Sequence, residues 1–229
     1  MKKKILAASL LGLFTLAATA YLEITGYNHF DTADGENPVC KIDPSCRQLE
    51  KEEIFLAKEV FGNEINYNTV KIFNRNSLFS WLIKDAMDAE GSKAIAPKGN
   101  IFIIDRQAYA KNFSAKPKSR TLYMHEMTHV FQYQNGKDVL TTAAKEYANA
   151  RFHYSYLYAF DIYSKNNFNN FGIEQQAQVI EDYQRLKNDF KIGSDSPSCA
   201  TIKKYEGKIQ QMLPLKPFAP CQNKVSEIS

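Results

Sequence analysis

Two histidines four residues apart, with a glutamate directly after the first, form the most constraining pattern in this sequence: His125-Glu126-Met127-Thr128-His129. The surrounding residues predict a helix from Ser119, as N-cap, to about Tyr133, with Asn135-Gly136 as its stop. Residues four apart share one face of a helix, so both imidazoles can reach one metal ion. A fold that uses this pattern has to bring a third protein ligand to the same face.

The glutamate inside the pattern indicates hydrolytic chemistry. Glu126 can reach a metal-bound water but not the metal itself, and zinc lowers the pKa of such a water to about 7. We therefore expect one Zn²⁺ per chain and peptide-bond hydrolysis with Glu126 as general base. The alternative is a helix with two incidental histidines, but two of the chain's four histidines occupy this spacing. Gln132 and Asn135 stand where a metzincin would have Gly and His, which excludes that class.

The third ligand is expected on a later amphipathic helix, predicted from Gly172 to Phe190. Glu174 and Glu181 are seven residues apart on it and share a face, so spacing alone leaves both open. We favour Glu174, because the small Ala177 one turn later would let this helix approach the histidine helix closely. Glu181 is the alternative and Glu146 the third candidate. The carboxylate that is not a ligand would lie in solvent or support a ligand histidine.

Residues 1–20 are predicted to be a secretory signal rather than part of the fold. A basic start, an apolar run and Ala18-Thr19-Ala20 are its three parts, with cleavage after Ala20. Removing the three lysines of this leader lowers the formal net charge from +4 to +1, which argues against nucleic acid as a partner. The protein is then periplasmic or secreted. The alternative is an inner-membrane anchor facing the periplasm, because residues 5–22 carry no charge; only then would the protein contact a membrane.

The four cysteines agree with an oxidising compartment. Four cysteines permit three pairings, and local closure favours Cys40–Cys46 and Cys199–Cys221, one bridge near each end of the mature chain. Four unpaired buried thiols are the alternative. Zinc binding by these cysteines is disfavoured, because their spacing fits no tetrahedral Cys/His site.

Hydropathy patterning predicts one helix-rich α+β domain over residues 47–213, after an extended lead-in at 21–46 that contains His29, and before a tail at 214–229. Strands are expected at 70–73 and 101–104, and a loop at 166–170. Further helices are expected at 47–61, 77–87, 140–151 and 199–213. The apolar strand before the histidine helix, the helix itself and the signal together suggest a zincin-like arrangement, with a small sheet whose edge strand holds substrate beside that helix.

The segment from Thr121 to Gln134 contains His-Glu-Met-Thr-His-Val-Phe-Gln and resembles the HEMTHVxQ segment of zinc metallopeptidases encoded near bacterial type VI secretion spike and Rhs components. Weaker similarity covers 59–70 and 99–101, and the stretch Ile173-Glu174-Gln175-Gln176-Ala177 is a second specific match. Phe131 stands where the family is expected to have Trp. The resemblance covers roughly residues 49–183.

This resemblance implies a gluzincin-like fold with His125 and His129 as zinc ligands, Glu126 as catalyst and Glu174 as third ligand. The expected partner is a secretion-system or inhibitor protein. Candidate oxyanion donors are His153, Tyr154 and Tyr156, whose alternative role is aromatic packing. The expected substrate is a peptide, a protein or the peptide stem of peptidoglycan. The competing function is a non-catalytic, zinc-stabilised binding or assembly module linked to a secretion apparatus.

Overall fold

Long helices and one small sheet make up the described chain, which in this computed structural model comprises residues 40, 44–74, 76, 93–150, 158–164, 167–190 and 197–222. This is the α+β class expected from the sequence. The elements in chain order are β1 (Cys46–Gln48), α3 (Lys51–Phe61), the 3-10 turn η1 (Tyr67–Thr69), β2 (Lys71–Phe73), β3 (Ala94–Ile95), β4 (Ile101–Ile103), α5 (Pro117–Gln134), α6 (Val139–Asn149), the 3-10 turn η2 (Phe168–Asn170), α8 (Ile173–Asp189), α9 (Cys199–Ile209) and α10 (Ala219–Gln222).

The sheet has four strands in the order β1-β2-β4-β3. The pairs β1–β2 and β3–β4 are antiparallel, whereas β2 and β4 run parallel, with Ile72 opposite Ile101. The two strands expected from hydropathy are therefore confirmed as β2 and β4. The strand at Ile101 lies inside the sheet, however, and the edge next to it is β3. The two residues of β3 are too few to produce an alternating pattern that could be recognised in the sequence.

The first helix begins later than its apolar pattern indicates. Arg47 belongs to β1, where it lies opposite Ile72, and α3 starts at Lys51. The cause is Glu53, whose buried carboxylate accepts hydrogen bonds from the Arg47 guanidinium (2.8 Å) and from the Glu50 backbone N–H (2.8 Å). These contacts hold residues 46–48 in the sheet and start the helix after Glu50. Gly62 ends it with φ 54°, a left-handed value that favours glycine.

The histidine helix α5 starts two residues before the expected N-cap Ser119. Pro117 is its first residue, a position where the missing N–H costs nothing because that group would have no partner in the helix. The helix ends where the sequence indicates, with Asn135 as C-cap and Gly136 at φ 82°. Every residue from 123 to 132 is buried, so α5 is the central helix of the fold rather than an amphipathic surface helix.

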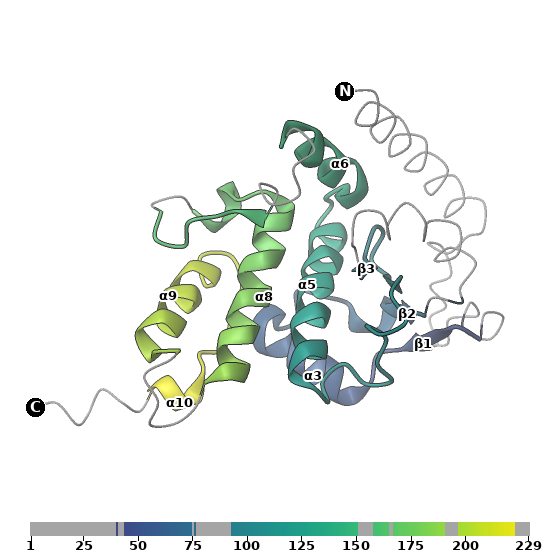
Figure 1. The fold of residues 1–229 in the computed structure, drawn as a ribbon, viewed down its shortest axis with the longest axis horizontal. Coiled ribbons are helices and arrows are strands. Elements are labelled where there is room, and N and C mark those ends of the chain that lie inside the picture. Colours follow the sequence, from purple (N-terminus) through teal and green to yellow (C-terminus); the bar gives the residue numbers. More distant parts are fainter. Residues whose placement is uncertain are drawn as a thin grey trace, which may run out of the picture.

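α5 and α8 lie side by side and antiparallel, with α9 on the far side of α8 and the strands on the other side of α5 (Figure 1). Contacts run from Gln132 with Ile173 at one end to Pro117 with Asn188 at the other. Ala177 is fully buried in α8, which agrees with the expected close approach of these helices.

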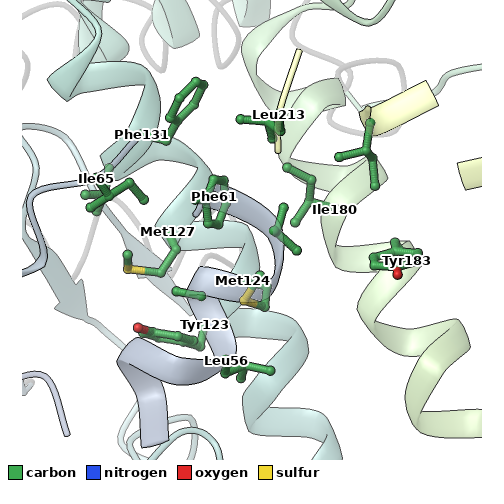
Figure 2. Packing of buried hydrophobic residues seen from close by; sticks show 14 of the residues in the cluster. Leu56, Phe61, Ile65, Tyr123, Met124, Met127, Phe131, Ile180, Tyr183 and Leu213 are labelled. Carbon is green, nitrogen blue, oxygen red and sulfur yellow. The ribbon is translucent and has the colours of Figure 1, made fainter. Parts of the chain in front are cut away.

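The main apolar core lies between α3, α5 and α8. Figure 2 shows Phe61 of α3 and Met124 of α5 in this space, with Ile180 contributed by α8. This packing fixes the position of the histidine helix along α8. It therefore determines which α8 carboxylate faces the two histidines.

Both predicted disulfides are present, and they account for all four cysteines: Cys40–Cys46, and Cys199–Cys221 between α9 and α10. The last long helix ends at Ile209, four residues short of the expected end, and the expected tail contains the short helix α10. The expected loop at 166–170 contains the turn η2.

Several predictions concern residues outside the described part of the chain. They are the signal at 1–20, most of the lead-in at 21–46, the helix at 77–87, the candidates His153, Tyr154 and Tyr156, and the last residues of the tail. Among the helices of the described segments, none combines the length and the apolar character needed to cross a membrane.

Candidate metal centre

Three side chains converge on one point between α5 and α8. The Oε2 atom of Glu174 lies 3.4 Å from His125 Nε2 and 3.3 Å from His129 Nε2. The three potential ligand atoms lie within 4.8 Å of one another, and all three residues are buried. Within the described residues, this is the group of histidine, cysteine and acidic side chains that could hold a metal ion.

Helix geometry explains how the two imidazoles come together. His125 and His129 are one turn apart on α5, and their ring centroids lie 5.0 Å apart at an interplanar angle of 76°. The first turn of α8 then places Glu174 against both Nε2 atoms. The side chains that meet between the two helices are therefore His125, His129 and Glu174, the three that the sequence pattern favoured as ligands.

The other candidate carboxylates have separate roles. Glu181 Oε2 lies 3.0 Å from His125 Nδ1, on the side of the ring away from Glu174, close enough for an ion pair but without hydrogen-bond alignment. Glu146 lies at the start of α8, where its Oε1 accepts a hydrogen bond from the Ile173 backbone N–H (3.0 Å). Neither belongs to the three-residue metal group, which contains Glu174.

His129 is supported by an amide rather than a carboxylate. Its Nδ1 lies 2.8 Å from Gln132 Oε1, and Gln132 in turn donates to the Gln176 side chain (2.9 Å). Both histidines therefore direct Nε2 toward Glu174 and Nδ1 toward a supporting side chain. This is the arrangement that metal-binding histidines usually show.

Glu126 is buried beside this group, and its side chain has an unsatisfied atom. It is 3% exposed, and Oε2 has no hydrogen-bond partner. Burial raises the pKa of Glu126 above its ordinary value, although the neighbouring His125 and His129 act in the opposite direction. A buried carboxylate with a free acceptor and a raised pKa is suited to accept a proton.

Charges within the site shift the pKa values of its members in opposite directions. Burial alone would lower the pKa of both histidines, but Glu174, and for His125 also Glu181, raise them above the ordinary value. Burial alone would raise the pKa of Glu174, but the two histidines lower it far below its usual range. The carboxylate is therefore ionised at neutral pH, as a metal ligand has to be.

The start of α8 is held by groups from outside that helix. Gly172, as N-cap, has no side chain to accept a hydrogen bond, and the Glu146 carboxylate occupies this place. A Cβ at Gly172 would lie 2.8 Å from Glu146 Oε2. Gln175 accepts from the Gly172 N–H (3.0 Å) and donates to the Ala159 carbonyl. These contacts fix the turn that carries Glu174.

The supporting roles of Gln132 and Gln176 and the position of Tyr158 were not predicted from the sequence. The Tyr158 ring lies 6.0 Å from the His125 ring, next to the segment that contains the predicted oxyanion donors. Glutamine gives no signal of its own in a helix. Its place three residues after a ligand histidine was the available clue.

The fold and the site together define a helix-rich α+β protein with a buried cluster of two histidines and one glutamate. Two imidazole nitrogens and a carboxylate oxygen form a set of donor atoms that could hold a divalent metal ion. The Oε2 atom of Glu126 beside this cluster has no hydrogen-bond partner in the protein, so it is available to accept a hydrogen bond from a further group at the site.

Similarity to known proteins relates this chain to one bacterial system. No family model matches the chain. It is 33% identical over 159 residues to the type VI secretion system spike protein VgrG2b of Pseudomonas aeruginosa. The match covers 69% of this chain, which spans only 15% of the length of that relative.

The same relative provides a similar solved structure. The effector domain of Pseudomonas aeruginosa VgrG2b superposes with a TM-score of 0.59 over 90% of this chain and 98% of that domain, at 23% sequence identity. The chain therefore shares the fold of this effector domain.

Proposed function

We propose that this protein is a zinc-dependent metallopeptidase. The observation that carries the proposal is the convergence of His125 Nε2, His129 Nε2 and Glu174 Oε2 on one buried point, with the free Oε2 of Glu126 beside it. Zinc is proposed because two imidazoles and one carboxylate are a common ligand set of catalytic zinc.

Each residue then has a defined role in hydrolysis. His125, His129 and Glu174 would hold the ion, which when bound supplies a Lewis acid for the scissile carbonyl and for water. Glu126 would accept a proton from the attacking water and deliver it to the leaving amine, since its raised pKa serves both steps. His153, Tyr154 and Tyr156 remain candidates for oxyanion stabilisation, and Tyr158 joins them because of its position beside His125.

We propose a zincin-like arrangement for substrate binding. Contacts between α5 and β3 support this proposal, because they put the edge of the sheet beside the helix that carries the histidines. An extended peptide can pair with such an edge through its backbone groups.

The proposed setting is an exported protein related to type VI secretion. Similarity to an effector domain of a spike protein supports this relation, and two disulfides support an oxidising compartment such as the periplasm. Peptides, proteins and the peptide stems of peptidoglycan are the proposed substrates. A secretion-system component or an inhibitor protein is the proposed partner.

Glu126→Gln tests the proposed catalysis. The amide keeps the shape of the side chain but cannot accept the proton, so we expect wild-type zinc content and about 10²–10⁴-fold slower cleavage of labelled casein or purified peptidoglycan. Glu64→Gln, at an exposed carboxylate, is the matched control and should behave as wild type. Equal activity of Glu126→Gln and wild type contradicts the proposal. Zinc-dependent stability without cleavage by either protein supports the non-catalytic module instead.

A further inference from the structure

A continuous hydrogen-bond chain leads from His129 to the backbone before α8. Gln132 Oε1 lies 2.8 Å from His129 Nδ1, and Gln132 Nε2 donates to Gln176 Oε1 at 2.9 Å. Gln132 is 1% exposed and Gln176 6%, so water does not compete for these groups. Each side-chain amide has one donor end and one acceptor end. The orientation of one amide in such a chain therefore fixes the orientation of the next.

Backbone carbonyls fix that direction. Gln176 Nε2 donates to the carbonyls of Phe168 (3.3 Å) and Phe171 (3.2 Å), and Gln132 Nε2 also donates to the carbonyl of Ile173 (3.0 Å). A carbonyl can only accept, so each amide nitrogen has to face these groups. The amide oxygen of Gln176 then faces Gln132, and the oxygen of Gln132 faces His129.

The orientation of Gln132 determines which ring nitrogen of His129 carries the hydrogen. A neutral imidazole carries its proton on either ring nitrogen, and only the other nitrogen has a lone pair for a metal. With an oxygen acceptor 2.8 Å away, Nδ1 of His129 has to carry the hydrogen. Nε2 faces Glu174 Oε2 at 3.3 Å, a longer contact than the one at Nδ1, so the relay holds the single hydrogen of the neutral ring on Nδ1. Nε2 then keeps its lone pair on the side of the ligand cluster.

We propose that Gln132 and Gln176 are positioning residues that lock His129 in its metal-binding tautomer, with the backbone carbonyls of residues 168, 171 and 173 as the fixed end of the relay. This inference rests on the proposed metal site and deepens it. Amide side chains hold the His129 tautomer without adding another carboxylate to a site that already contains Glu126, Glu174 and Glu181. The repulsion between negative charges is therefore lower than it would be with a carboxylate in the place of Gln132.

The test replaces each amide by a side chain of equal length that can neither donate nor accept in this way. The variants are Gln132→Met and Gln176→Met, and the matched control is Gln134→Met on the same helix. The Gln134 amide contacts Asn66 and Thr69 and takes no part in the relay. Zinc affinity is measured by competition with a chelator. NMR of the ring nitrogens, at a pH where the imidazoles are neutral, reports which nitrogen carries the hydrogen with and without zinc.

We expect wild-type His129 to carry its hydrogen on Nδ1 in both states. Gln132→Met should bind zinc about 10–100-fold more weakly and show mixed tautomers when metal-free. Gln176→Met should lose less, because Gln132 keeps its bond to the Ile173 carbonyl. Gln134→Met should match the wild type.

Two results overturn the relay: a wild-type His129 with its hydrogen on Nε2, or a Gln132→Met protein with wild-type tautomer and affinity. If Gln132→Met does not fold, the wild-type tautomer and Gln176→Met decide the question. A wild-type protein that binds no zinc refutes the proposed metal site, and the metal-free tautomer still tests the relay separately.

Discussion

Glu181 Oε2 lies 3.0 Å from Nδ1 of His125, on the side of the imidazole away from Glu174. The two carboxylates therefore contact opposite nitrogens of the same ring, although they share one face of α8. Seven residues correspond to about 10 Å along a helix, and the antiparallel packing of α8 on α5 puts only Glu174 level with both Nε2 atoms. In the proposed metal site, Glu181 therefore contacts the second nitrogen of His125 rather than the metal.

Glu174→Gln and Glu181→Gln should consequently differ in metal binding. Loss of the Glu174 carboxylate removes a ligand, so we expect no stoichiometric zinc after desalting. Loss of the Glu181 carboxylate should weaken zinc binding by about 10–100-fold while leaving the stoichiometry at one. Metal analysis and chelator competition measure both. The reverse order of effects would identify Glu181 as the ligand.

Helix periodicity does not encode which of these two carboxylates faces both histidines. Helix periodicity was sufficient to predict that His125 and His129 share a face, because that relation is local. The level at which α8 meets α5 depends on core packing around residues such as Phe61 and Ile180, which periodicity does not encode. The role of Gln132 could not be predicted for a related reason: a helical glutamine usually faces solvent, and only the buried α5–α8 contact gives it a partner.

Stability of the metal-free protein should fall as pH rises above about 6.5. The pKa values of His125 and His129 are raised in the fold, so their favourable contribution is complete below the ordinary histidine value of about 6.5 and is lost as pH rises through the raised values. The lowered pKa of Glu174 acts at the acid end: its contribution is present above about pH 4.3 and is lost as pH falls through the lowered value. Burial raises the pKa of Glu126, so this group lowers the stability as pH rises from about 4.3 through its raised value.

Thermal unfolding after chelation, at pH 5 to 9, measures this trend. Glu174→Gln serves as comparison, because without that carboxylate the pKa values of the two histidines in the fold should lie lower. The decline above about pH 6.5 should then be smaller and end at a lower pH than in the wild type. Zinc affinity should follow the opposite course and rise with pH, since the metal binds neutral imidazoles. A metal-free stability that increases between pH 6.5 and 9 would contradict the charge arrangement described for this site.

The start of α8 should depend on Glu146. Its carboxylate caps Ile173 and takes the place of the side chain that Gly172 lacks. Glu146→Ala should lower the free energy of unfolding by about 1 kcal/mol, the usual cost of a lost helix cap, and should also weaken metal binding through Glu174. Lys145→Ala, at an exposed position of the same helix, is the control and should change neither quantity. Denaturant unfolding that gives equal stabilities for both variants would rule out the capping role.

The ligand set itself is tested most directly by a crystal structure of the zinc-soaked protein, with anomalous diffraction recorded on both sides of the zinc absorption edge. The proposed site predicts one anomalous peak per chain, about 2.0–2.2 Å from His125 Nε2, His129 Nε2 and a Glu174 carboxylate oxygen, with Glu126 beside the peak but not bound to the metal. Zinc held through Glu181 or through a histidine Nδ1, or no zinc between α5 and α8, would contradict it.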